Sequence, residues 1–350
     1  MNRLIATLIV FTVLVQSGCA TTKAPPPEPL YTAGSIERID PALDAIVGVD
    51  ARIELLDEGF DWSEGPVWVP PRKGSPGYVL FSDVPQNAVY KWQQGKGGSV
   101  ALVPSGYTGS TPRGGGLGSN GLMLDAADPG KLILCQHGDR RLARADLPLS
   151  LTTKFETVID NHDGKKFNSP NDLTFHSNGD LYFTDPPYGM PKKFDDPNRE
   201  LEYQGVFRLG TDGKTTLLTK EMTRPNGIAF SPDEKTLYVA QSDPEAALWM
   251  AYDVKDDGTV ENGRVFFDVT KWVKERPGLP DGMKVDQKGN VIATGPGGVW
   301  IFDSSGKHLG TILTGQRTGN CCFGDDGHSL YICADMYLLR VRLKTKGTGF

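Results

Sequence analysis

The stretch NGIAF at residues 226–230 is followed by three more apolar runs, LYVAQS (237–242), LWMAYD (248–253) and RVFFDV (264–269). Each run has the length of a short β-strand, and turns rich in polar residues and glycine separate the runs. The same pattern occurs six times in the chain: a polar residue, then Gly or another residue, and then an apolar strand. Recurrence of one four-strand unit indicates a repeat architecture.

The six copies follow one another at spacings of 39 to 56 residues, and the last ends after its third strand. The run RIELL (52–56) precedes the first copy and belongs to no other unit, so we expect it to supply the missing strand. The sequence therefore predicts an all-β, six-bladed β-propeller of four-stranded blades, with the ring closed by an N-terminal strand. Two or three β-sandwich domains are the alternative, but they would not explain why every unit begins with a similar polar residue.

The first residues of the six copies are expected to converge. They are Glu64, Asn120, Asn171, Asn226, Asp281 and Asn320. The first strand of a propeller blade lies beside the central channel, so these residues would form a ring at one face. Carboxylate and amide oxygens suit a hard cation such as Ca²⁺ or Mg²⁺, and the lack of His and Cys argues against a preference for Zn²⁺. The alternative is ordinary turn chemistry, because Asn-Gly and Asp-Gly are common turn dipeptides, although Glu64 is not a turn residue.

The N-terminus predicts export. Arg3 precedes an apolar run at residues 4–15 that is too short for a mature membrane-spanning helix and is typical of a signal peptide. The sequence QSGC (16–19) resembles a bacterial lipoprotein cleavage box, with Gln16 where an aliphatic residue is usual. We therefore expect a signal peptide over residues 1–19, with cleavage before a lipidated Cys19. The alternative is an ordinary signal peptide cut nearby.

The rest of the chain divides into a Pro-rich tether at residues 20–35 and the propeller domain at residues 36–350. The expected product is a periplasmic, membrane-anchored lipoprotein that contacts the membrane only through its lipid and is a monomer or weak dimer. Its net charge of −6 and the lack of a Lys/Arg cluster argue against nucleic acid as a partner.

Four further cysteines lie in the predicted propeller. They are Cys135, Cys321, Cys322 and Cys333. An exported chain would allow Cys333 to pair with Cys321 or Cys322 across a hairpin. The alternative is that all four are small buried hydrophobic residues.

Several motifs occur in the order found in a known family. They are EGPVW (64–68), NSPNDL (168–173), FTDPPYG (183–189), RPNGIAFSPD (224–233) and LPDGMKVD (279–286). Together they resemble the senescence marker protein/gluconolactonase family, also called regucalcin-like. The segments CQHGDRR (135–141) and GKKFNSPND (164–172) are similar to its bacterial gluconolactonase branch.

The resemblance implies a six-bladed propeller with one catalytic divalent ion that hydrolyses a small sugar lactone. Matched motif by motif, it places the metal ligands at Glu64, Asn171, Asn226 and Asp281, with Asp281 as the general base. Ca²⁺ is the expected ion, with Mn²⁺, Mg²⁺ or Zn²⁺ as possible substitutes in vitro.

The resemblance also implies substrate contacts in the loop before Asn171, at Lys166 and Asn168. Lys166 replaces the Arg usual in the bacterial branch and lacks its bidentate fork. The remaining ring amides, Asn120 and Asn320, are further expected substrate contacts.

A lactone needs a polarised carbonyl and an activated water, which a cation and a carboxylate base can provide. His137 is a candidate to protonate the leaving alkoxide, and a hydrogen-bonded structural histidine is the alternative. No Gly-x-Ser-x-Gly elbow is present, so a covalent acyl-enzyme is not supported. Two other functions remain open: a non-catalytic Ca²⁺- or sugar-binding propeller, and an esterase or phosphotriesterase that uses the same ion.

Overall fold

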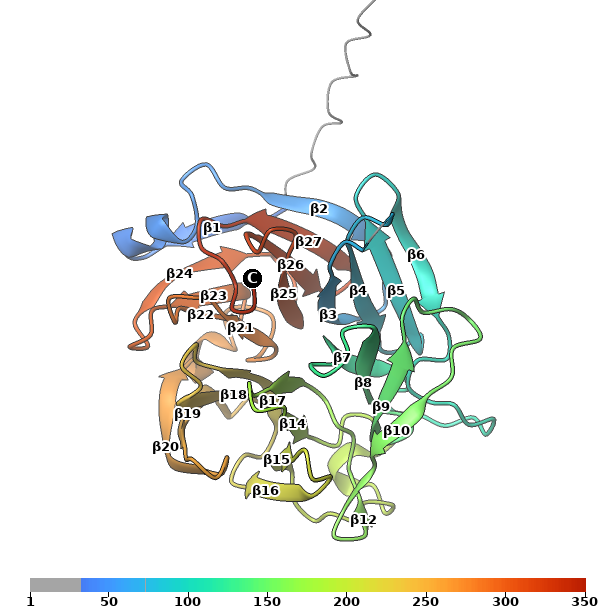
Figure 1. Ribbon diagram of the computed structural model, residues 1–350. Helices are drawn as coiled ribbons and strands as arrows, with labels where there is room; N and C mark the ends of the chain where they lie inside the picture. Colours follow the sequence, from blue (N-terminus) through green and yellow to red (C-terminus); the bar gives the residue numbers. More distant parts are fainter. Residues whose placement is uncertain (1–32, 73) are drawn as a thin grey trace, which may run out of the picture. The chain divides into compact units, whose positions relative to one another are not determined.

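The computed structural model describes residues 33–72 and 74–350, in which six antiparallel sheets of four or five strands surround a central channel (Figure 1). A seventh, two-stranded sheet lies outside this ring of blades. The predicted all-β, six-bladed propeller is confirmed. No helix in these residues has the length and apolarity needed to cross a membrane. The predicted signal peptide, the lipidated Cys19 and most of the tether lie outside the described residues.

The first three blades are meanders in which each strand pairs with the next. Blade 1 consists of β3 (Ser63–Val69), β4 (Tyr78–Asp83), β5 (Ala88–Gln93) and β6 (Gly97–Leu102). Blade 2 consists of β7 (Ser119–Leu124), β8 (Lys131–Gln136), β9 (Arg141–Asp146) and β10 (Glu156–Ile159). Blade 3 consists of β13 (Leu173–Phe175), β14 (Leu181–Asp185), β15 (Gly205–Leu209) and β16 (Thr215–Thr219).

Blades 4 to 6 repeat this pattern, except that the outer strand of blade 6 comes from the N-terminal part of the chain. Blade 4 consists of β17 (Pro225–Phe230), β18 (Thr236–Asp243), β19 (Ala246–Val254) and β20 (Val260–Asp268). Blade 5 contains β21 (Met283–Val285), β22 (Val291–Gly295), β23 (Gly298–Phe302) and β24 (His308–Leu313). Blade 6 consists of β25 (Asn320–Gly324), β26 (Ser329–Ala334), β27 (Tyr337–Arg342) and β2 (Ile53–Glu58).

Two N-terminal strands close the ring. Strand β2 pairs with β27, with Ile53 opposite Val341, which confirms the closure predicted from residues 52–56. Strand β1 (Ser35–Arg38) adds a fifth strand to blade 5 by pairing with β24, and the sequence did not predict it. Its four residues are too short and too polar to stand out as a strand. Short elements complete the described chain: η1 (Pro41–Ala45), β11 (Asn161–His162), β12 (Lys165–Lys166), η2 (Lys193–Asp195) and η3 (Thr270–Trp272).

The hydrophobic core is divided among the blade interfaces. Six clusters of buried residues each join two neighbouring blades. Alternate residues of a strand face opposite sides of its sheet, so each blade contributes to two clusters. Between blades 4 and 5, for example, Trp249 and Trp300 are both fully buried, with ring centroids 6.1 Å apart. This packing on both faces explains why inner strands such as β22 are buried along their whole length.

The four cysteines of the propeller are buried free thiols. In the β25–β26 pair, Cys333 lies opposite Asn320, and Cys321 lies opposite Ile332. The cysteine side chains pack within hydrophobic clusters, so the interpretation as small buried hydrophobic residues is confirmed and the Cys333 pairing is not formed.

Glycine follows several ring residues because neighbouring blades meet there. A Cβ atom on Gly227 would lie 2.2 Å from the carbonyl oxygen of Asp281 in the next blade. A Cβ atom on Gly65, which has a φ of +50°, would lie 2.0 Å from the carbonyl oxygen of Asn120. These Asn-Gly and Glu-Gly pairs are therefore points of close approach between blades rather than isolated turns.

Gly227→Ala is expected to destabilise the protein by about 3 kcal/mol or more, because the added methyl overlaps backbone that has little room to move. Thermal unfolding measures the effect. Gly114→Ala is the matched control, since the nearest atom to its added Cβ is a Pro191 carbon 3.9 Å away. Equal unfolding temperatures for the two variants would contradict the close approach of blades 4 and 5.

Candidate functional site

A cavity of about 790 Å³ lies at one mouth of the channel, where the innermost strands begin. Five of the six predicted ring residues line it, together with His137 from the end of β8. The five are Glu64, Asn120, Asn171, Asn226 and Asp281. The structure therefore brings together all four residues that the family resemblance named as metal ligands.

Irregularities in the innermost strands explain why these side chains reach the cavity. The pairing of β3 with β4 shifts register between Glu64 and Val67, and β17 shifts against β18 between Pro225 and Ile228. Strand β7 has a similar shift immediately after Ser119. A bulge of this kind re-aims a side chain and ends regular pairing. In blades 3 and 5 the strand itself begins only after the ring residue.

Three carboxylates lie close together at the base of the cavity: Glu64 and Asp172 are buried, and Asp281 is half-buried. Burial raises the pKa of Glu64 to about 8, and the nearby Asp172 carboxylate adds to the effect. Burial, followed by repulsion from Glu64 and Asp172, holds the pKa of Asp281 well above its usual value. Burial also raises the pKa of Asp172. Close negative charges that water cannot screen favour either protons or a bound cation.

Asn171 presents a buried oxygen that has no hydrogen-bond partner in the described residues. Its Nδ2 atom lies 3.4 Å from Nε2 of His137. Burial, assisted by the charge of Arg113, lowers the pKa of His137 to about 3, so the imidazole is neutral and Nε2 can accept from the amide. This contact orients the Asn171 amide and leaves its Oδ1 free for another ligand.

Asn226 is oriented in a similar way. Its Nδ2 donates to the Ser242 hydroxyl at 2.8 Å, and that hydroxyl donates in turn to the carbonyl of Pro280. Because Pro280 directly precedes Asp281, this chain of hydrogen bonds couples the two ring residues across blades 4 and 5. The Asn226 amide also lies close enough to the Asp281 carboxylate to favour its charged form, which lowers the pKa of Asp281 and partly opposes the effect of burial.

Three predicted substrate contacts do not line the cavity. Asn320 donates to Asp172 at 3.3 Å within the buried carboxylate network. Asn168 is buried and donates to the carbonyls of Asp185 and Tyr203, so it holds the loop that follows β14. Lys166 lies on the short strand β12.

The sequence did not single out several residues of the site. Asp172 follows Asn171 at a position where most other copies carry glycine, and this departure from the repeat was the signal that could have revealed it. The cavity is also lined by side chains from the surrounding loops, for which the sequence offered no repeat signal: Trp62, Tyr188, Lys193, Arg224 and Arg317.

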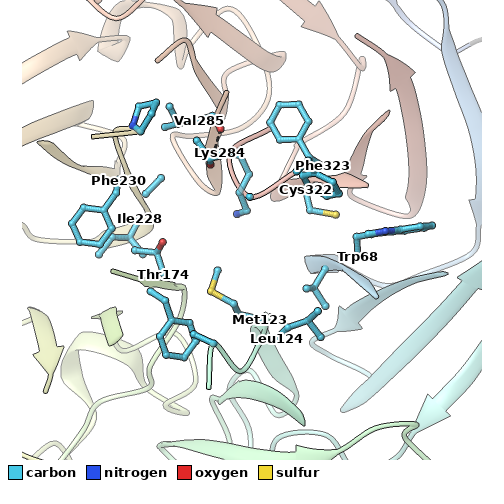
Figure 2. Close-up of a pocket in the computed structure, with 18 of the residues that line it drawn as sticks. Trp68, Met123, Leu124, Thr174, Ile228, Phe230, Lys284, Val285, Cys322 and Phe323 are labelled. Atoms are coloured by element: carbon cyan, nitrogen blue, oxygen red, sulfur yellow. Dashed lines mark hydrogen bonds between the residues drawn. The ribbon is translucent and has the colours of Figure 1, made fainter. Parts of the chain in front are cut away.

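The opposite mouth of the channel is different in character. Its cavity of about 690 Å³ is lined mainly by apolar side chains from the far ends of the innermost strands, as Figure 2 shows for Trp68, Ile228 and Phe323. The Lys284 ammonium points into this space and donates to the carbonyl of Met283 at 2.9 Å. The converging oxygen donors therefore mark the first mouth, not this one, as the candidate site for metal and substrate.

No three His, Cys, Asp or Glu side chains in residues 33–72 and 74–350 are placed to hold a metal ion by themselves. An ion at the first mouth would therefore need the amide oxygens of the ring as well as its carboxylates. Such a mixed, all-oxygen donor set is typical of sites for hard cations.

Comparison with known proteins identifies the family of the chain. The family model described as the SMP-30/gluconolactonase/LRE-like region matches residues 62–335. The chain is 41% identical over 322 residues to the gluconolactonase of Zymomonas mobilis, which covers 90% of this chain and 88% of that protein. It is 27% identical over 284 residues to the pentonolactonase XacC of Haloferax volcanii, which covers 79% of this chain and 83% of that protein.

A solved structure of a gluconolactonase from Xanthomonas campestris matches with a TM-score of 0.75 and 31% identity, over 91% of this chain and 99% of that one. Both the family model and the Zymomonas protein extend over most of the propeller. The chain belongs to the SMP-30/gluconolactonase/LRE-like family.

Proposed function

We propose that this protein hydrolyses a small sugar lactone with the help of one divalent cation, Ca²⁺ by preference. The observation that carries the proposal is the cavity base, where the oxygens of Glu64, Asn171, Asn226 and Asp281 converge. The names of its relatives, a gluconolactonase and a pentonolactonase, support the substrate class.

The residues at the cavity base fit a hard cation. The Asn171 Oδ1 atom is buried without a partner, and a cation would satisfy it. The raised pKa values of Glu64 and Asp281 mark concentrated negative charge that a cation would neutralise. Glu64, Asn171, Asn226 and Asp281 would hold the ion, while His137 and Ser242 keep the two amides in orientation.

When bound, a divalent cation polarises the lactone carbonyl and makes water more acidic. The Asp281 carboxylate removes a proton from the attacking water as the new C–O bond forms. Asp281 then returns this proton to the ring oxygen as the lactone C–O bond breaks, which completes hydrolysis to the hydroxy acid.

His137 takes a positioning role in this proposal. Its pKa of about 3 disfavours a protonated imidazole near neutral pH, so it is poorly suited to protonate the leaving alkoxide. Its contact with Asn171 instead turns that amide oxygen toward the cavity.

Chelator-stripped protein is expected to lose hydrolysis of glucono-1,5-lactone and to recover it when Ca²⁺, Mn²⁺, Mg²⁺ or Zn²⁺ is added back singly. The assay follows acid release and includes aryl esters and a phosphotriester at matched concentrations. Faster turnover of either ester class would favour the esterase alternative. Tight cation binding without turnover of any lactone would favour a non-catalytic binding protein.

A further inference from the structure

The cavity has a cationic rim above its acidic base. Three positively charged side chains line it: Lys193, Arg224 and Arg317. Each comes from a different loop, so no single local motif accounts for them. They follow β14, precede β17 and precede β25, respectively.

The two rim arginines are unusual for this protein. In residues 33–72 and 74–350, every arginine except Arg52, Arg224 and Arg317 donates a side-chain hydrogen bond to another protein group. Two of these three exceptions therefore line the same cavity. Lys193 likewise makes no side-chain hydrogen bond or salt bridge within this part of the chain, whereas Lys307 and Lys344 do. The rim thus holds cationic donors that the fold itself does not use.

Arg224 is held close to the proposed reaction centre. It lies two residues before Asn226, and its guanidinium lies over the Phe194 ring, 5.2 Å from the ring centroid. Such stacking positions a planar guanidinium while leaving its N–H donors available. Arg317 is exposed, so it can move toward a bound molecule.

The charge balance favours an anionic substrate. A divalent cation at the cavity base would offset the charges of Glu64 and Asp281, and Lys284 partly offsets that of Asp172. Asp243 is an acidic neighbour of Arg224 and has its pKa lowered in part by that charge, whereas Arg317 and Lys193 form no salt bridge within residues 33–72 and 74–350. A neutral sugar lactone has no group to match the positive rim. We propose that the preferred substrate is a sugar lactone with an additional carboxylate or phosphate, remote from the lactone carbonyl, that binds Arg224, Arg317 and Lys193. This inference rests on the proposed lactonase function.

The test compares glucono-1,5-lactone with glucarolactone and 6-phosphogluconolactone on the cation-loaded protein. We expect kcat/KM at least tenfold higher for one or both anionic lactones, and a preference that shrinks as salt rises. Arg317→Gln should raise KM about tenfold for the preferred anionic lactone, with kcat and the neutral lactone little changed. Arg52→Gln, another exposed arginine without a side-chain hydrogen bond, should change none of these values.

A higher kcat/KM for glucarolactone would indicate a carboxylated substrate, and a higher kcat/KM for 6-phosphogluconolactone would indicate a phosphorylated one. Equal or higher kcat/KM for the neutral lactone, or an equal effect of Arg317→Gln on all three, would overturn the inference and leave the lactonase function standing. If no lactone is turned over, the proposed function fails. Calorimetry with the open-chain acids then tests separately whether the rim binds an anionic group. Glucarate or 6-phosphogluconate should then bind at least tenfold more tightly than gluconate, and Arg317→Gln should remove that difference. Equal binding of the three acids would overturn the role of the cationic rim in binding an anionic group.

Discussion

Asp281→Asn is expected to lower kcat for lactone hydrolysis by about a thousandfold, the size of effect typical for loss of a positioned general base. Asparagine keeps the shape of the side chain and one oxygen that can face a cation. It cannot accept the proton that leaves the attacking water. The protein should fold normally, since the change removes one of the three mutually repelling carboxylates. Steady-state kinetics at saturating Ca²⁺ measures the effect.

Asp325→Asn is the matched control because Asp325 lies at the opposite mouth of the channel, where it accepts a hydrogen bond from Tyr331. Its kcat should equal that of the unmodified protein. Full activity of the Asp281→Asn variant would remove Asp281 from the role of base. Raising the Ca²⁺ concentration separates the two roles of Asp281, since excess ion would restore a lost ligand but not a lost base.

Glu64→Gln is expected to weaken Ca²⁺ binding by about a hundredfold or more, because it removes a charged ligand from a buried site. The glutamine can still accept the Gly65 N–H that Glu64 binds at 2.8 Å. Without Ca²⁺ the variant should be at least as stable as the unmodified protein, since repulsion with Asp172 and Asp281 is reduced. Calorimetry measures affinity, and thermal unfolding with and without Ca²⁺ measures stability.

A ligand at a hundred times its Kd stabilises a protein by about 2.7 kcal/mol, so the rise in unfolding temperature on adding Ca²⁺ should largely disappear in this variant. Glu234→Gln, at the opposite mouth, should keep the full rise. An unchanged Ca²⁺ affinity for Glu64→Gln would exclude Glu64 as a ligand. A loss of stability without Ca²⁺ would indicate a structural role for its charge instead.

Much of the architecture was predictable because it repeats. Four apolar runs per unit and a similar first residue in each unit are visible without coordinates, and ring closure follows from a missing strand at one end and a spare run at the other. The fifth strand of blade 5 was missed because residues 35–38 carry no apolar alternation. Its place depends on pairing with β24, far along the chain.

Apart from His137, the candidate site was predictable only where it coincides with the first residue of a repeat unit. Glu64 and Asp281 were found as first residues of their units, and both line the cavity. Asn320 has the same place in its unit, yet it bonds Asp172 below the cavity instead of lining it. Whether a ring amide faces the cavity depends on its neighbours in adjacent blades, which the sequence of one unit does not reveal.

Loop residues could not be placed from the sequence at all. Asn168 precedes a ring residue by three positions, yet the fold uses it to anchor the chain after β14. Arg317, in a loop with no recognisable motif, reaches the cavity because that loop ends beside the channel.

By itself the sequence determined the number of blades, the closure of the ring and the kind of residue that begins each blade, because strand periodicity and repetition are local properties of the chain. Only the tertiary structure decided which oxygens share one cavity, which carboxylates repel one another and which positively charged side chains line the rim. These properties depend on distance and burial, and both are set by the packing of one blade against the next.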